Sequence, residues 1–102
     1  MARVNVTIKL FREEKTWDGN VIDKDIGEYK GWMEDGSSLT FIHTDGKNIG
    51  LIWEGQGTLF LWDDLDLSKC FFMVDGKRRD IVRVSRFEDG KGRFHHLEVI
   101  YK

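Results

Sequence analysis

The chain has 102 residues, of which 40% are hydrophobic and 13% aromatic, with a formal net charge of −2 and no proline. This composition excludes a disordered chain and predicts one globular domain, residues 1–102, that buries a hydrophobic core. No apolar stretch has the length of a signal peptide or a membrane span, and the single cysteine, Cys70, can form no internal disulfide. These features favour a cytoplasmic protein that does not enter a membrane.

Charge is distributed unevenly along the chain. Residues 13–66 hold thirteen acidic side chains against four lysines, whereas residues 67–102 hold nine lysines and arginines against five acidic side chains. An acidic middle and a basic C-terminal third are typical of a surface that meets a charged partner. The alternative is that the two parts face each other across strands and cancel.

Short apolar runs separated by turn residues dominate the sequence, and five Asp-Gly pairs stand among them. Asp and Gly both tolerate the positive φ of tight turns, so Asp-Gly between β-branched or aromatic runs predicts a hairpin. The five pairs are Asp18-Gly19, Asp35-Gly36, Asp45-Gly46, Asp75-Gly76 and Asp89-Gly90.

The first predicted strand is Val4–Leu10, where apolar and polar residues alternate with a period of two. A polar loop follows from Glu13 to Asn20 and contains Trp17. A less regular strand covers residues 26–33, in which Gly27 and Gly31 indicate a bulge or a bend.

The next hairpin joins residues 39–44 to residues 48–54 around Asp45-Gly46. A two-residue loop there pairs Thr44 with Lys47 and places Phe41 opposite Gly50. Gly55-Gln56-Gly57 is predicted to make the following reversal. The run Thr58–Trp62 is apolar on both faces, which predicts the most buried strand, and residues 63–68 are predicted as a short helical turn.

The last two reversals are both predicted as four-residue loops. In the first, such a loop pairs Phe72 with Ile81. In the second, it pairs Phe87 with Phe94 and Val84 with Leu97, and it avoids the like-charged pairs that a shorter loop creates.

Together these elements predict an all-β domain of about eight antiparallel strands in a hairpin meander. A meander of this length closes most simply into a small, closed or partly closed up-and-down β-barrel, with a β-sandwich as the alternative. Closure requires the first strand to pair with the last, Phe94–Tyr101. Without that pairing two edges are free, and a homodimer through an edge strand becomes an alternative.

No pattern for catalysis or for a cofactor stands out. The sequence contains no nucleophile–base motif, phosphate-binding glycine loop or metal cluster, which predicts a non-enzyme without a metal or cofactor. His95 and His96 are neighbours on a predicted strand, so their side chains are expected on opposite faces. Asp63, Asp64 and Asp66 are expected to form a solvated acidic turn.

Two features predict partner binding. Trp17 lies in a polar loop without obvious apolar neighbours, as an interface anchor does, although it could equally plug one end of a barrel. Basic residues gather in the C-terminal hairpins, where aromatic residues are interleaved with them. The predicted partner-binding residues are Trp17, Lys77, Arg78, Arg79, Arg86, Lys91 and Arg93.

The sequence therefore predicts a non-enzymatic interaction module, an inhibitor or adaptor that binds a protein partner. The alternative is a β-barrel that binds single-stranded nucleic acid through the basic hairpins, or a small ligand in its interior. A sequence pI of about 5.9 weighs against a dedicated nucleic-acid binder.

Overall fold

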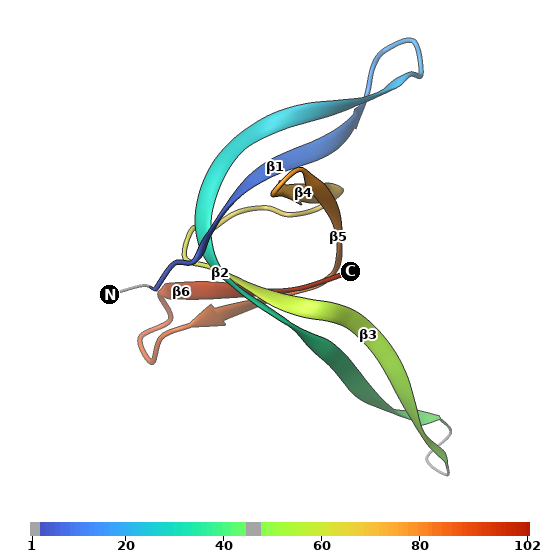
Figure 1. The fold of residues 1–102 in the computed structure, drawn as a ribbon, viewed down its shortest axis with the longest axis vertical. Helices are drawn as coiled ribbons and strands as arrows, with labels where there is room; N and C mark the ends of the chain where they lie inside the picture. The colour runs from blue at the N-terminus through green and yellow to red at the C-terminus, as the bar shows by residue number, and fades with distance from the viewer. Residues whose placement is uncertain (1–2, 45–47) are drawn as a thin grey trace.

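The computed structural model describes residues 3–44 and 48–102, and the side chains of residues 3–36 and 55–102. Within these ranges the chain forms one antiparallel sheet of six strands without a helix (Figure 1). The strands are β1 (Val6–Lys15), β2 (Val21–Thr44), β3 (Asn48–Leu61), β4 (Cys70–Val74), β5 (Lys77–Glu88) and β6 (Phe94–Tyr101). The predicted all-β class is confirmed. No helix of these ranges is long and apolar enough to cross a membrane.

The predicted count of about eight strands is wrong because two predicted reversals are not turns. Asp35-Gly36 lies inside β2, which has 24 residues, and Gly55-Gln56-Gly57 lies inside β3. Gly57 is needed there for close packing, since a Cβ atom would lie 2.3 Å from the Tyr101 hydroxyl oxygen and 2.5 Å from the Glu34 carbonyl oxygen. The predicted helical turn over residues 63–68 is also absent from the structure.

The paired strands form a ring in the order β1-β2-β3-β6-β5-β4, which β1 closes by pairing with β4. This order is a Greek key, because β4 returns through residues 62–69 to lie beside β1. The consecutive order of an up-and-down meander is therefore wrong, and so is the expected route to closure through the first and last strands. Strand β6 pairs with β3 and β5 instead.

Two hairpins extend beyond this ring of strands. Strand β2 pairs with β1 over Val21–Gly31 and with β3 over Gly31–Thr44, so it belongs to both hairpins. Figure 1 shows the β1–β2 hairpin projecting on one side of the ring and the β2–β3 hairpin on the other. In the projecting parts each strand has only its hairpin partner beside it.

The core fills the inside of the ring. Its largest side chains, each less than 2% exposed, are Ile8, Leu10, Leu59, Leu61, Phe72, Leu97, Val99 and Tyr101. Phe72 meets Tyr101 edge to face, with 5.7 Å between ring centroids. The run Thr58–Trp62, which was predicted to be the most buried strand, is buried on one face only. Leu59 and Leu61 are buried, whereas the alternating Phe60 and Trp62 are half-buried.

The Asp75-Gly76 loop is shorter than predicted. Asp75 (φ 50°) and Gly76 (φ 74°) both adopt positive φ, as a type I′ turn requires, and Val74 pairs with Lys77. Phe72 consequently pairs with Arg79 rather than with Ile81. The predicted four-residue loop is wrong because Asp-Gly here supplies both central residues of a two-residue turn.

The β5–β6 loop is longer than predicted. Glu88 pairs with Phe94 across residues 89–93, and Val84 pairs with Val99 rather than with Leu97. The Asp89 carboxylate organises this loop by accepting hydrogen bonds from the Lys91 and Arg93 amides at 2.8 and 3.0 Å.

The β2–β3 register differs from the prediction by one residue. Thr44 pairs with Asn48, and Phe41 therefore lies opposite Leu51 rather than Gly50. The Asp45-Gly46 turn itself lies outside the described residues.

Candidate interaction site

The tip of the β1–β2 hairpin presents the most exposed large apolar side chain of the described chain. Trp17 is 98% exposed, in the loop that joins Lys15 to Val21. Burial of an indole ring is among the strongest contributions to protein association, so a fully exposed Trp is a candidate binding residue. The structure thus places the sequence-predicted Trp17 at a tip and not in the end of the ring.

Hydrogen bonds hold this loop in one shape. The Thr16 amide donates to the Asn20 carbonyl at 2.7 Å, and the Gly19 amide donates to the Thr16 carbonyl at 3.0 Å. The Asp18 carboxylate accepts from the Asn20 amide at 3.3 Å, from the Asn20 side-chain amide at 3.0 Å and from the Thr16 hydroxyl. The Thr16 hydroxyl, more than the Asn20 amide, lowers the pKa of Asp18 below its ordinary value.

Two further apolar side chains lie beside Trp17 on the hairpin. Val21 is 59% exposed and Ile22 is 48% exposed, and they point to opposite faces as successive residues of a strand do. Their cross-strand partners are Lys15 and Glu14, so neither has an apolar neighbour opposite it. Residues 16–20, the loop that carries Trp17, are called the hairpin tip.

A groove of about 690 Å³ lies along this hairpin, from the Lys15–Val21 pair beside the loop to Arg12 and Lys69. Its lining residues are Arg12, Glu13, Glu14, Lys15, Val21 and Lys69. The Arg12 guanidinium is held by a 2.6 Å hydrogen bond from Nη2 to the Asp66 carbonyl oxygen. Arg12 Nε is buried and has no hydrogen-bond acceptor among the described residues.

The predicted basic residues do not converge on one surface. Lys77 follows the Asp75-Gly76 turn, while Lys91 lies in the β5–β6 loop. Arg78 stacks on Phe71 at 3.8 Å from the ring centroid and forms ion pairs with Asp80 at 3.0 Å and Glu13 at 3.5 Å.

Arg79 is half-buried at one end of the ring. It donates to the Gln56 side-chain oxygen at 3.0 Å and lies 5.3 Å from the Tyr101 ring centroid. The Tyr101 hydroxyl donates to the Asp35 carboxylate. Burial, and then this hydrogen bond, raise the pKa of Tyr101 well above its ordinary value.

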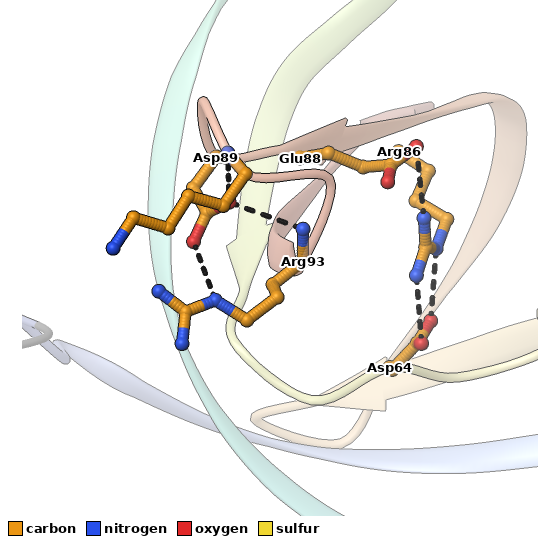
Figure 2. Close-up of polar contacts among 6 residues, drawn as sticks. Asp64, Arg86, Glu88, Asp89 and Arg93 are labelled. Carbon is orange, nitrogen blue, oxygen red and sulfur yellow. Dashed lines mark hydrogen bonds and ion pairs between the residues drawn. The ribbon is translucent and has the colours of Figure 1, made fainter.

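Arg86 and Arg93 are also bound within the chain (Figure 2). Arg86 donates to both carboxylate oxygens of Asp64, at 3.2 and 3.0 Å, and lies 3.5 Å from Glu88. This bidentate hydrogen bond is the main cause of the lowered pKa of Asp64. Arg93 Nε donates to Asp89 at 3.3 Å. Of the six predicted basic residues, the four arginines therefore use their guanidinium groups in contacts within the chain.

A row of aromatic rings that the sequence did not single out crosses the outer face of the sheet. Trp32 of β2 pairs with Phe60 of β3, whose ring centroid lies 6.3 Å from that of His96 of β6. His96 stacks on Phe87 of β5 at 4.8 Å and 5°. Period-two alternation identifies each ring as outward-facing, but their alignment depends on long-range register.

The prediction that His95 and His96 point to opposite faces is wrong. A bulge leaves His95 without a cross-strand partner, because Phe87 pairs with His96 and Glu88 with Phe94. The two Nδ1 atoms consequently lie 2.7 Å apart, and His96 Nε2 lies 3.2 Å from a Glu98 oxygen. Within the described part of the chain, no three His, Cys, Asp or Glu residues are grouped to hold a metal ion.

Comparison with protein-family models, with curated proteins and with solved structures finds no match for this chain.

Proposed function

We propose that this chain is a cytoplasmic, non-enzymatic interaction module, a small closed β-barrel that docks onto a protein through its hairpin tip. The observation that carries the proposal is the 98% exposure of Trp17 on a loop fixed by hydrogen bonds. Burying a Trp removes about 150–250 Å² from water, which corresponds to roughly 4–6 kcal/mol of gross driving force. A preformed loop loses little conformational freedom on binding, so more of this driving force becomes affinity.

The charged residues have different roles in this proposal. Arg78, Arg79, Arg86 and Arg93 connect strands and loops of the ring. Lys77 and Lys91 form no ion pair with a described residue and remain available to a partner. A rigid ring with a projecting apolar tip suits an inhibitor or adaptor that fills a groove on its target.

Site-specific photocrosslinking tests the proposal. A photoreactive phenylalanine analogue at position 17 is expected to give a crosslinked protein product in cell extract, and the same analogue in place of Val82, which is 39% exposed on β5, is not. Excess wild-type chain is expected to compete for the product, whereas excess Trp17→Ala chain is not. Equal products from both positions, or no product from position 17, contradict docking through the tip.

Single-stranded nucleic acid is a second candidate, and one observation favours it. The row of Trp32, Phe60, His96 and Phe87 spans four neighbouring strands, and aromatic rings on a sheet can stack bases. Fluorescence anisotropy with labelled oligonucleotides over a salt series tests this. Binding that weakens with salt and with Phe87→Ala supports it, and no binding at low salt removes it.

A further inference from the structure

Each copy of the chain carries both an apolar tip and a groove of complementary chemistry. Trp17 stands free at the end of the hairpin, and the groove of about 690 Å³ opens along the same hairpin, between the Lys15–Val21 pair and Arg12. A volume of this size is comparable to that of small-molecule sites and exceeds the volume of an indole ring. The groove can therefore receive a Trp side chain from another molecule.

The lining of the groove suits an indole. Arg12, Lys15 and Lys69 bring three cations to it, and cations bind the face of Trp more strongly than that of other aromatic residues. Val21, which is 59% exposed, supplies an apolar wall. The 2.6 Å hydrogen bond from Arg12 to the Asp66 carbonyl holds one of the three cations in place before anything binds.

Charge also favours a tip of this same sequence. Asp18 follows Trp17 directly, and its lowered pKa keeps the carboxylate ionised at neutral pH. A tip that enters the groove brings this carboxylate toward the groove's cations, of which Lys15 and Lys69 form no ion pair with a described residue. The groove's two acidic residues, Glu13 and Glu14, already have internal partners in Arg78 and Lys24.

The spacing allows each of two copies to insert its Trp17 into the groove of the other. The groove begins at Lys15 and Val21, the last strand pair before the loop, and extends to Arg12, which lies five residues, or about 17 Å of strand, from Trp17. Two hairpins that lie antiparallel about a two-fold axis overlap over this length. Each Trp17 then reaches the other copy's groove. Such a contact is isologous and closes at two copies.

We propose that the chain forms a homodimer in which each Trp17 inserts into the groove of the other copy. The inference rests on the proposed function, because it names a second copy of this chain as the protein that occupies the hairpin tip. The interface is small, so association is expected to be weak and to depend on concentration over the micromolar range.

Sedimentation equilibrium over a concentration series tests the dimer. The average mass of the wild-type chain is expected to rise from 12.0 kDa toward twice that value. Trp17→Ala is expected to weaken association by about 30-fold or more, as loss of a central Trp does in other interfaces. Phe87→Ala is the matched control, because it removes an aromatic ring that is 41% exposed but lies on another face.

A mixture of two variants tests the mutual exchange. Trp17→Ala keeps the groove and loses the Trp, whereas Val21→Glu keeps the Trp and places an acid in the groove. Each variant alone is expected to stay monomeric. Their mixture recovers one of the two Trp–groove contacts and is expected to associate more strongly than either variant. Far-ultraviolet circular dichroism confirms that both variants are folded.

Three results overturn the dimer: a wild-type monomer at every concentration, a Trp17→Ala chain that associates as the wild type does, or a mixture no stronger than its components. The crosslinking at position 17 separates this failure from failure of the proposed function. If the chain is monomeric but crosslinks to other proteins, the dimer is contradicted and the proposed function stands. If the chain is monomeric and crosslinks to no protein, both proposals are contradicted.

Discussion

The ring of strands and the projecting β1–β2 hairpin belong to one sheet but use apolar residues differently. In the ring, Leu59 and Val99 are completely buried, whereas on the hairpin Trp17 and Val21 are 98% and 59% exposed. A two-stranded ribbon has no second layer to cover its apolar side chains and is stabilised mainly by what it adjoins. Trp17 and Val21 therefore contribute little to the core, and in the proposed function they serve association.

The largest difference between the two regions is expected from removing one aromatic ring from each. Phe72 is completely buried against Tyr101, so Phe72→Ala is expected to lower the free energy of unfolding by about 3–5 kcal/mol. Trp17→Ala is expected to change it by less than about 0.5 kcal/mol. Urea denaturation measured at protein concentrations that keep the chain monomeric checks both values. A comparable loss in Trp17→Ala contradicts the distinction.

A smaller effect is expected from adding one methyl group. Gly57→Ala places a Cβ atom 2.3 Å from the Tyr101 hydroxyl oxygen, and relieving this contact is expected to cost about 1–3 kcal/mol. Gly36→Ala, in the projecting part of β2, is the matched control because its Cβ meets no atom within 4 Å. Thermal unfolding of the two variants compares the ring with a projecting strand. Equal melting temperatures show that the ring does not hold Tyr101 against Gly57.

A still smaller effect is expected from the Tyr101 hydroxyl, and it depends on pH. Because the pKa of Tyr101 is raised in the folded chain, the unfolded chain loses this proton first, and stability falls as pH rises above about 10. Tyr101→Phe is expected to lose about 1 kcal/mol at neutral pH with the hydrogen bond to Asp35. The variant is also expected to show a weaker alkaline loss. Urea denaturation at pH 7 and pH 11 measures both, and an unchanged alkaline loss contradicts the assignment.

The fold was predictable as far as local sequence determines it. Alternation predicted a strand at Val4–Leu10, and β1 covers Val6–Lys15, so the strand exists but extends into the predicted loop. The Greek-key order was not predictable, because the pairing of β1 with β4 joins residues about sixty positions apart without a local signal. Asp-Gly pairs indicate where positive φ is tolerated but not how many residues a loop has. Asp75-Gly76 is a two-residue turn, whereas Asp35-Gly36 continues a strand.

The candidate site was predictable only where a residue lacks neighbours. Trp17 stood among polar residues in the sequence, and the structure leaves it exposed. The basic residues were misleading, because their acidic partners come from other parts of the chain. Arg86 meets Asp64, which is 22 residues away, and Arg78 meets Glu13 from another strand. Sequence shows the number of charges, whereas three-dimensional contacts decide which of them remain available.

The smallest expected effect on stability concerns the order of the hairpin tip. Asp18→Ala removes the carboxylate that accepts hydrogen bonds from Asn20 and Thr16, and nothing in the ring contacts it. Global stability is therefore expected to stay unchanged, while the Asn20 amide exchanges faster and the Trp17 backbone becomes more mobile on the nanosecond timescale. Amide hydrogen exchange and nitrogen-15 relaxation measure these changes, with Asp23→Ala as the control on the same hairpin.

Acid should reproduce this effect in the wild-type chain. Because the pKa of Asp18 is lowered in the folded loop, its hydrogen bonds are complete above the ordinary aspartate pKa and are lost as pH falls through the lowered value. If a preformed loop is what makes Trp17 an effective anchor, Asp18→Ala weakens association without removing any apolar contact. If the loop of Asp18→Ala becomes mobile while association is unchanged, the order of the loop does not contribute to affinity. Trp17 then binds through its exposed area alone, and the hydrogen bonds of the loop stabilise only the hairpin.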